Sequence, residues 1–152
     1  MLATPESDAV EVGVAFSTAV PGTVTAINFY KGPGNGGAHV GHIWSTGGVA
    51  LATVDFAAET ESGWQTAALS TPLTLVPGEK YIVSYLAPQG HYSYTSRYFQ
   101  TAKTTGPLTA PAAGTGPAGN GLFAYGPNGG FPQATYGATN YFVDVSFTPT
   151  TP

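Results

Sequence analysis

Glycine and proline interrupt this sequence at such short intervals that no long helix fits between them. The chain contains 21 glycines and 13 prolines in 152 residues, and both residue types disfavour helix interiors. Between them, apolar residues alternate with polar or small ones, as at Val10, Val12, Val14 and Phe16. An alternation with a period of two predicts a β-strand with one buried face. We therefore expect an all-β protein.

Strand patterns recur roughly every 8–12 residues with turn residues between them, which is typical of sandwiches and barrels. The sequence predicts an antiparallel β-sandwich, jelly-roll or immunoglobulin-like, with about eight or nine strands. A proline at position 72 divides two of these strands in the prediction, because proline cannot donate to a sheet. The expected strands cover residues 10–16, 23–30, 39–45, 49–56, 63–69, 73–76, 80–86, 92–98 and 141–147.

Residues 100–140 differ from the rest of the chain because they are rich in glycine, proline, alanine and threonine. Loops of this length are uncommon in a compact domain. Isolated aromatic residues at Phe123, Tyr125, Phe131 and Tyr136 indicate that the segment packs onto the sandwich. We expect a long ordered loop here, with a hairpin over residues 121–125.

The charge of the chain excludes several classes of protein. Only 8% of the residues are charged, and four Lys and Arg stand against eight Asp and Glu, which is too few for a phosphate-binding stripe. Nucleic acid is therefore not an expected partner. No apolar run approaches the roughly 20 residues of a membrane span, so no membrane insertion is expected. The absence of cysteine excludes disulfides and thiolate metal sites.

The ends of the chain have a different composition from its middle. We divide it into an N-terminal tail (1–7), a β-sandwich module (8–148) and the start of a Thr/Pro-rich linker (149–152). A linker of this kind predicts neighbouring domains in a larger, modular chain. Low charge with abundant Thr, Ser, Gly, Tyr and Asn favours a secreted or cell-surface location.

Six segments together resemble one bacterial family. They are residues 12–16 (VGVAF), 22–32 (GTVTAINFYKG), 39–44 (HVGHIW), 63–65 (GWQ), 81–85 (YIVSY) and 140–147 (NYFVDVSF). In this order they resemble the family called domain of unknown function 4082, over roughly residues 8–148. The resemblance implies a β-sandwich module of large secreted bacterial proteins, often beside immunoglobulin-like or catalytic domains. It implies no established activity and no agreed catalytic residues.

The three histidines, His39, His42 and His91, are the first candidates for a metal site. On one strand, positions 39 and 42 point to opposite faces, so hydrogen-bonded strand-end histidines are the favoured interpretation. We expect no metal site and no cofactor. A structural calcium ion held partly by backbone carbonyls remains an alternative, although no Asp-rich loop supplies the six to eight oxygen ligands that calcium takes.

Few acidic residues are available for catalysis. Asp55 and Asp144 fall within expected strands, whereas Glu6, Glu59, Glu61 and Glu79 fall in polar segments where solvation is the simplest interpretation. A glycosidase needs two facing carboxylates, and nothing in the spacing of Asp55 and Asp144 supports such a pair. No Gly-x-Ser-x-Gly elbow occurs, and the glycine-rich residues 32–37 read as a surface turn rather than a phosphate loop. An enzyme is therefore the least favoured class.

Aromatic residues give the richest functional signal. Flat rings with short polar groups bind the apolar C–H faces of sugars without charge. Trp44 and Trp64 are expected in the core, while tyrosines such as Tyr125 and Tyr136 are candidates for exposed rings. The segment 91–98 is especially dense in aromatic and polar groups. The predicted glycan-binding residues are His39, His42, Tyr85, His91, Tyr92, Tyr94 and Arg97.

These features lead us to expect a non-catalytic module that binds polysaccharide through ring stacking and neutral hydrogen bonds. The main alternative is a structural spacer or adhesion domain without a ligand. Such a spacer can carry an isopeptide between Lys31 and Asn140, assisted by Asp144 or Asp55, if strand 23–30 pairs with strand 141–147. An ordinary surface lysine is the favoured interpretation of Lys31. A histidine-based metal site or a glycan-active enzyme comes last.

Overall fold

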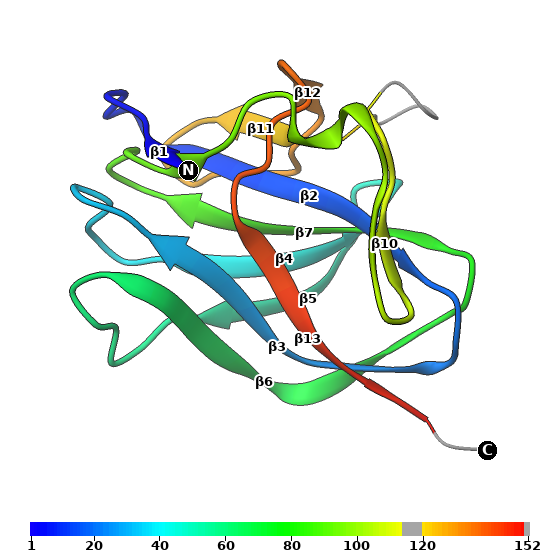
Figure 1. The fold of residues 1–152 in the computed structure, drawn as a ribbon. Helices are drawn as coiled ribbons and strands as arrows, with labels where there is room; N and C mark the ends of the chain where they lie inside the picture. The colour runs from blue at the N-terminus through cyan, green and yellow to red at the C-terminus, as the bar shows by residue number, and fades with distance from the viewer. Residues whose placement is uncertain (114–119, 151–152) are drawn as a thin grey trace.

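The structure is a computed structural model that describes residues 1–113 and 120–150. Its strands and one short 3-10 helix follow one another along the chain (Figure 1). They are β1 (Leu2–Ala3), β2 (Val10–Thr18), β3 (Gly22–Lys31), β4 (Val40–Ser45), β5 (Ala50–Asp55), β6 (Gly63–Leu75), β7 (Lys80–Ala87), β8 (Ser93–Tyr94), η1 (Tyr98–Gln100), β9 (Lys103–Thr105), β10 (Leu108–Ala110), β11 (Leu122–Tyr125), β12 (Ala134–Thr135) and β13 (Val143–Pro149).

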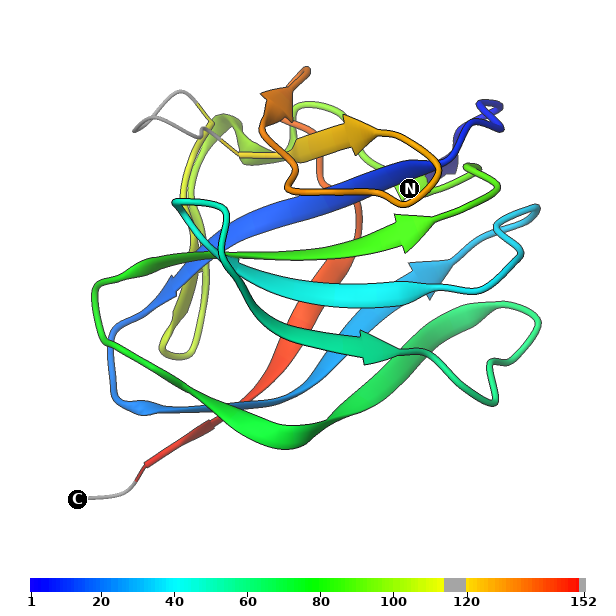
Figure 2. The same ribbon diagram turned by 180° about the vertical axis from the view of Figure 1, so that it is seen from behind.

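Two antiparallel sheets face each other. The larger sheet has the order β12-β11-β2-β7-β4-β5, with β10 also pairing β2 and β9, and the smaller sheet has the order β13-β3-β6. In Figure 1 the smaller sheet lies in front of the larger one, and Figure 2 shows the molecule from the large-sheet side. A small ribbon of β1 and β8 lies at one end. The predicted all-β, antiparallel sandwich is confirmed.

The core forms where the inward faces of the two sheets meet. On β2 the alternating Val10, Val12, Val14 and Phe16 all point into it and are buried. The ring of Phe29 from the smaller sheet stacks on Tyr85 of the larger sheet, with centroids 4.2 Å apart. Each fully buried side chain of this size contributes about 1.5–3 kcal/mol by leaving water. The period-two pattern in the sequence therefore marks the inward face correctly.

The outer face of the larger sheet is also partly covered. Residues 126–132 pass over it, and Phe131 packs against Trp44 with ring centroids 5.5 Å apart. Ala15, Ile82 and Leu122 complete this second, smaller cluster. Strand β2 is consequently buried on both faces along most of its length. The predicted packing of the long loop is thus correct for Phe131, and the predicted burial of Trp44 is confirmed.

The prediction that Pro72 divides two strands is wrong. The expected strands 63–69 and 73–76 form one continuous strand, β6, through Pro72. Strand β6 is an edge strand of the smaller sheet, and its register with β3 shifts between Val24 and Ala26. Edge strands and bulges tolerate proline because its missing N–H is not needed by a neighbour there.

The prediction that Trp64 lies in the core is wrong. Its neighbour Gln65 points inward and is buried, so alternation along β6 turns Trp64 outward. Trp64 is 51% exposed, and its ring packs edge to face with Tyr30, with ring centroids 5.7 Å apart. The position of an aromatic residue in the alternation of a strand, and not its hydrophobicity, therefore decides to which face of the sheet its side chain points.

Segments expected to be tail or loop carry short strands. Residues Leu2 and Ala3 of the expected N-terminal tail pair with Tyr94 and Ser93, so this tail is part of the folded domain. The expected strand 92–98 is reduced to β8, because the chain turns into η1 after Arg97, whose φ is 60°. At the other end β13 continues to Pro149, and the Thr150 N–H donates to the Pro21 carbonyl at 2.9 Å.

The expected loop 100–140 contains β9, β10, β11 and β12. Residues 121–125 do not form a hairpin of their own. Instead β11 adds to the edge of the larger sheet by pairing with β2, and β12 pairs with β11 in turn. Residues 114–119 of this segment lie outside the described part of the chain.

Candidate functional site

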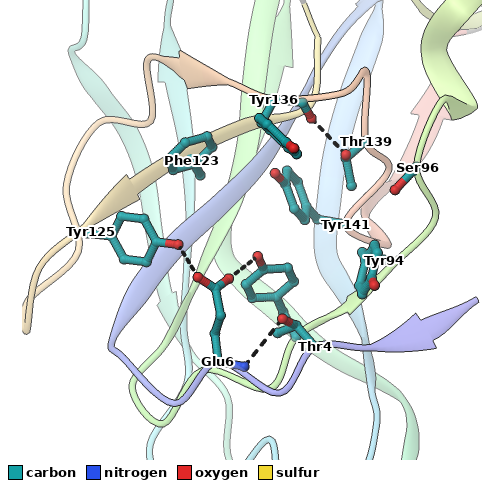
Figure 3. Close-up of a pocket in the computed structure, with 10 residues that line it drawn as sticks. Thr4, Glu6, Tyr94, Ser96, Phe123, Tyr125, Tyr136, Thr139 and Tyr141 are labelled. Atoms are coloured by element: carbon teal, nitrogen blue, oxygen red, sulfur yellow. Dashed lines mark hydrogen bonds between the residues drawn. The ribbon is translucent and has the colours of Figure 1, made fainter.

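A cavity of about 420 Å³ opens at the end of the sandwich that carries β1 and β11. Six of its lining residues are aromatic and the others are polar (Figure 3). They come from the N-terminal segment, from residues 92–96, from β11 and from residues 136–141. We call this site the tyrosine cavity, and its lining consists of Thr4, Glu6, Tyr92, Tyr94, Ser96, Phe123, Tyr125, Tyr136, Thr139 and Tyr141.

Backbone pairing brings these four segments together. The Thr4 N–H donates to the Tyr92 carbonyl at 3.0 Å, next to the β1–β8 pairing. An antiparallel bridge between Thr95 and Asn140 ties residues 92–96 to residues 136–141. Gly121, at a φ of 76°, lies so close to Thr139 that a Cβ there would overlap the Thr139 carbonyl oxygen. A residue with a side chain at position 121 would therefore push β11 away from the cavity.

Glu6 is held at the wall of the cavity by two tyrosines. The Tyr92 hydroxyl donates to Oε2 at 2.8 Å, and the Tyr125 hydroxyl donates to Oε1 at 2.7 Å. Burial, followed by the hydrogen bond to Glu6, raises the pKa of Tyr92. The hydrogen bond to Glu6 is the main cause that raises the pKa of Tyr125. Both hydroxyls therefore keep their protons and act as donors to the carboxylate.

The carboxylate of Glu6 keeps unused capacity for hydrogen bonds. A carboxylate offers about four lone-pair sites on its two oxygens, and each oxygen of this exposed side chain accepts one tyrosine hydroxyl. Further acceptor positions are thus free for a ligand. In Figure 3 Glu6 lies between Tyr125 and Thr4, on the side of the cavity opposite Thr139 and Tyr136.

The aromatic walls are arranged edge to face. Tyr92 meets Tyr141 at an interplanar angle of 82° and Tyr94 at 69°. Phe123 meets Tyr125 at 70°. Burial raises the pKa of Tyr141 to about 12. At the rim, Tyr125 is 51% exposed and Tyr136 is 78% exposed, so these two rings are available to a ligand.

Two of the seven predicted binding residues, Tyr92 and Tyr94, line the tyrosine cavity. His91 lies beside it, with Nδ1 3.0 Å from the Thr4 carbonyl oxygen and its ring against Gly34. Arg97 is exposed in the turn before η1 and is not among the lining residues. The structure therefore brings together only part of the predicted surface.

Tyr85 and His39 do not belong to any exposed surface, because both are buried between the sheets. They form a chain of polar contacts that we call the buried network, which consists of Lys31, Asn35, His39, Glu59 and Tyr85. His39 Nε2 lies 2.8 Å from Asn35 Oδ1, and its Nδ1 lies 2.8 Å from Glu59 Oε1. The Asn35 side chain meets the Tyr85 hydroxyl at 3.2 Å. Although residues 32–37 were expected to form a surface turn, Asn35 is buried within it.

The charge on His39 depends on the orientation of the Asn35 amide. With Oδ1 facing the ring, both ring nitrogens have to carry protons, so the ring is charged. Burial disfavours that charge and lowers the pKa of His39, although the hydrogen bond to Glu59 acts in the opposite direction. A neutral ring is satisfied when the amide turns over, because Nδ2 then donates to Nε2 while Tyr85 donates to Oδ1. Protonation and amide orientation are therefore coupled.

The side chains of Lys31 and Asn140, which the predicted isopeptide would join, form hydrogen bonds with other groups. Strands β3 and β13 do pair, as that interpretation requires. The Lys31 ammonium, however, donates to Glu59 Oε1 at 3.1 Å and to the Thr60 carbonyl at 3.2 Å. Asn140 Oδ1 accepts the backbone N–H of Phe142. Glu59, expected to be solvated, is instead the acceptor for both Lys31 and His39.

His42 points to the opposite face of its strand from His39, as the spacing predicts. Its Nδ1 lies 3.0 Å from Glu11 Oε2, which also accepts the Ser84 hydroxyl at 2.6 Å. Trp44 Nε1 donates to the same hydroxyl at 2.8 Å. Glu11 is fully buried, and its Oε1, which faces Gly129, has no hydrogen-bond partner in the part of the chain that the structure describes.

The acidic residues do not form a second candidate site. Asp55 lies on β5 of the larger sheet, whereas Asp144 lies on β13 of the smaller sheet and accepts from Asn28 Nδ2 at 2.9 Å. Burial raises the pKa of Asp144. Within residues 1–113 and 120–150, no group of three or more His, Cys, Asp or Glu is placed to hold a metal ion.

A second hollow, of about 410 Å³, runs along the edge of β13. Its walls include Trp64, Leu108, Phe142 and Val145, and the Lys103 ammonium lies 4.9 Å from the ring centroid of Tyr98 at its margin. Trp64 provides an exposed aromatic ring that is not part of the tyrosine cavity.

Sequence reasoning missed most of the tyrosine cavity. The sequence predicts exposed rings at Tyr125 and Tyr136 but does not place them in one site, and it predicts a solvated Glu6. The signal that pointed to them was the isolated aromatic residues in the 100–140 segment. Nothing in the sequence indicated that residues 4–6 would pack beside that segment.

The comparisons with known proteins concern almost the whole chain. The model of the family described as "Domain of unknown function (DUF4082)" matches residues 1–143. No curated protein shows a significant match to the sequence. No helix among the described residues is both long and apolar enough to cross a membrane. Because the family match includes every strand from β1 to β12 and the start of β13, the chain belongs to the domain of unknown function 4082 family.

Proposed function

We propose that this domain is a non-catalytic glycan-binding module of a secreted or cell-surface bacterial protein, and that its binding site is the tyrosine cavity. The observation that carries the proposal is the convergence of six aromatic side chains around one anchored carboxylate. The volume of the tyrosine cavity falls within the range of about 300–1,000 Å³ that is usual for small-molecule sites.

The lining suits the chemistry of a sugar. A pyranose ring presents C–H groups on its faces, which pack on aromatic rings, and hydroxyls on its rim, which need hydrogen-bond partners. The rings of Tyr125 and Tyr136 are exposed at the rim, while Thr4, Ser96 and Thr139 add short polar side chains. Stacking and neutral hydrogen bonding are thereby available in one place.

The same lining supports binding rather than hydrolysis. Glycoside hydrolysis uses two carboxyl groups that face each other across the scissile bond. Glu6 is the one carboxylate among the residues that line the tyrosine cavity in the described part of the chain. The tyrosines beside it hold their protons, because the pKa values of Tyr92 and Tyr125 are raised.

Screening on a glycan array followed by calorimetry with the best ligand tests the proposal. Tyr136→Ala and Tyr125→Ala are each expected to weaken binding by roughly 3- to 10-fold, since a stacked ring contributes on the order of 0.5–1.5 kcal/mol beyond its buried area. Trp64→Ala is the matched control, because Trp64 and Tyr125 are both 51% exposed. The control should bind like the unaltered protein.

Two results would contradict the proposal. An array without any binding would favour the alternative, a spacer or adhesion domain without a ligand. An effect of Trp64→Ala equal to that of Tyr125→Ala would move the binding surface to the hollow along β13.

A further inference from the structure

We propose that the tyrosine cavity selects glycans that carry a protonated amino group, such as glucosamine units, over neutral and acidic glycans. This inference rests on the proposed function and adds the charge of the ligand. It follows from the position of Glu6, from the absence of a counter-charge among the lining residues, and from the surrounding aromatic rings.

The charge of the cavity is the first step. Among the residues that line it in the described chain, Glu6 is the one charged side chain, and no Lys, Arg or His is present. The two groups that bind Glu6 are neutral hydroxyls of Tyr92 and Tyr125. Asp8 lies near enough to act electrostatically on Tyr125, which adds a second negative charge close by. The empty cavity is therefore electronegative.

The basic residues Lys31, His91, Arg97 and Lys103 are not among the residues that line the cavity. His91 turns its Nδ1 toward the Thr4 carbonyl oxygen at 3.0 Å. Lys31 pairs with Glu59 in the buried network, and Lys103 lies over the Tyr98 ring. An incoming ammonium thus supplies the positive charge that the site lacks.

The geometry of the acceptor fits an ammonium group. One tyrosine hydroxyl binds each oxygen of the Glu6 carboxylate, and each oxygen retains a free lone pair. An ammonium has three donors, and its charge adds a Coulomb attraction to the charge-assisted hydrogen bond that any donor makes with this carboxylate. The tyrosine rings add to this, because the faces of aromatic rings attract cations within about 6 Å.

Neutral and acidic glycans do not bring a positive charge to Glu6. A neutral sugar offers Glu6 a hydroxyl donor without this Coulomb attraction, so stacking provides a larger share of its binding. A uronic acid or a sulfated sugar brings a second negative charge toward Glu6 and Asp8, and like charges repel. The expected order of affinity is amino sugar, then neutral sugar, then acidic sugar.

The test compares oligosaccharides of equal length by calorimetry at about pH 6, where an amine of this kind is protonated. The probes are β-1,4-linked glucosamine, its N-acetylated counterpart and a galacturonic acid oligomer. We expect the amino oligomer to bind roughly 5- to 10-fold more tightly than the acetylated one at low ionic strength, and we expect this preference to shrink in about 1 M salt.

The decisive variant is Glu6→Gln, which keeps the shape of the side chain and removes its charge. The preference for the amino oligomer should fall to within about 2-fold, because affinity for the amino oligomer should decrease more than affinity for the acetylated oligomer. Because the protein carries a net charge of −4, a polycation is also attracted to it without specificity. Glu61→Gln controls for this effect, since it removes the same charge from an exposed turn and should leave the preference intact.

Each outcome distinguishes the two proposals. Equal binding of amino and acetylated oligomers, or a preference that survives in Glu6→Gln, overturns this inference and leaves glycan binding in place. A preference lost equally in Glu61→Gln shows a general charge effect and also overturns it. Failure of all three oligomers to bind, together with a blank array, overturns the proposed function and this inference with it.

Discussion

The tyrosine cavity and the buried network differ in the partners of their glutamates and in how exposed those glutamates are. Each contains a glutamate and a tyrosine hydroxyl. In the buried network, Glu59 accepts from both Lys31 and His39, and Asn35 joins His39 to Tyr85. In the tyrosine cavity, Glu6 also accepts from two groups among the described residues, but these are neutral hydroxyls, and the Glu6 side chain is exposed.

The difference distinguishes a structural role from a binding role. A buried polar group that is left without a partner costs about 1–3 kcal/mol, so the groups of the buried network satisfy one another and have little left for a ligand. Exposed polar groups form their remaining hydrogen bonds with water, and a ligand can displace that water. The sequence-predicted residues His39 and Tyr85 fall in the first class, whereas Tyr92 and Tyr94 fall in the second.

The largest expected effect comes from removing a ring from each region. Tyr85→Ala should destabilise the domain by about 3–5 kcal/mol, because it removes a fully buried ring that stacks on Phe29 and leaves a cavity. Tyr136→Ala should change stability by less than about 0.5 kcal/mol, since its ring is at the surface. Urea unfolding followed by circular dichroism measures both, and similar losses in the two variants would refute the comparison.

A smaller effect is expected from removing a polar group from each region. Asn35→Ala should cost about 1–3 kcal/mol, because it leaves His39 Nε2 and the Tyr85 hydroxyl without a partner inside the protein. Glu6→Ala should cost less than about 0.5 kcal/mol, because the released hydroxyls of Tyr92 and Tyr125 turn to water. The same unfolding experiment compares them, and a larger loss for Glu6→Ala would contradict the assignment of roles.

The smallest expected effect is a dependence of stability on pH in the range where His39 of the buried network titrates. Burial lowers the pKa of His39 below the ordinary value of 6.5. As the pH falls below about 6.5, the unfolded chain takes up a proton at this position before the folded chain does. The contribution of His39 to stability is therefore complete above that pH and decreases as the pH is lowered through the range below it.

The difference in unfolding free energy between the protein and His39→Gln isolates this contribution. We expect the difference to shrink as the pH is lowered from about 7.5 toward 5. His91→Gln serves as the control beside the tyrosine cavity, where the ring is only partly buried. A difference for His39→Gln that grows on acidification would show that His39 is charged in the folded protein.

Strand positions could be predicted from the sequence where the pattern is local. The alternation of Val10, Val12 and Val14 gave both the strand and its buried face, since side chains alternate across a sheet. The same rule gave the opposite orientations of His39 and His42. The same alternation also indicates that Trp64 faces outward, whereas the expectation of a buried Trp64 rested on its hydrophobicity.

The predictions failed where a segment depends on a distant partner. Pro72 is compatible with a strand only because β6 lies at a sheet edge beside a register shift. Glu11 is polar on a strand that was expected to have one solvated face, yet residues 126–132 cover that face. Neither edge position nor the cover can be deduced from neighbouring residues.

The sequence by itself determined the fold class, the main strands and the inward faces of the sandwich, because backbone preferences and side-chain alternation act over a few residues. Only the tertiary structure decided which polar and aromatic groups meet. Residue 6 and residue 125 are far apart along the chain, and the pairing of β1 with β8 and of β11 with β2 brings them within hydrogen-bond distance. The tyrosine cavity exists through these long-range pairings, and no local pattern records them.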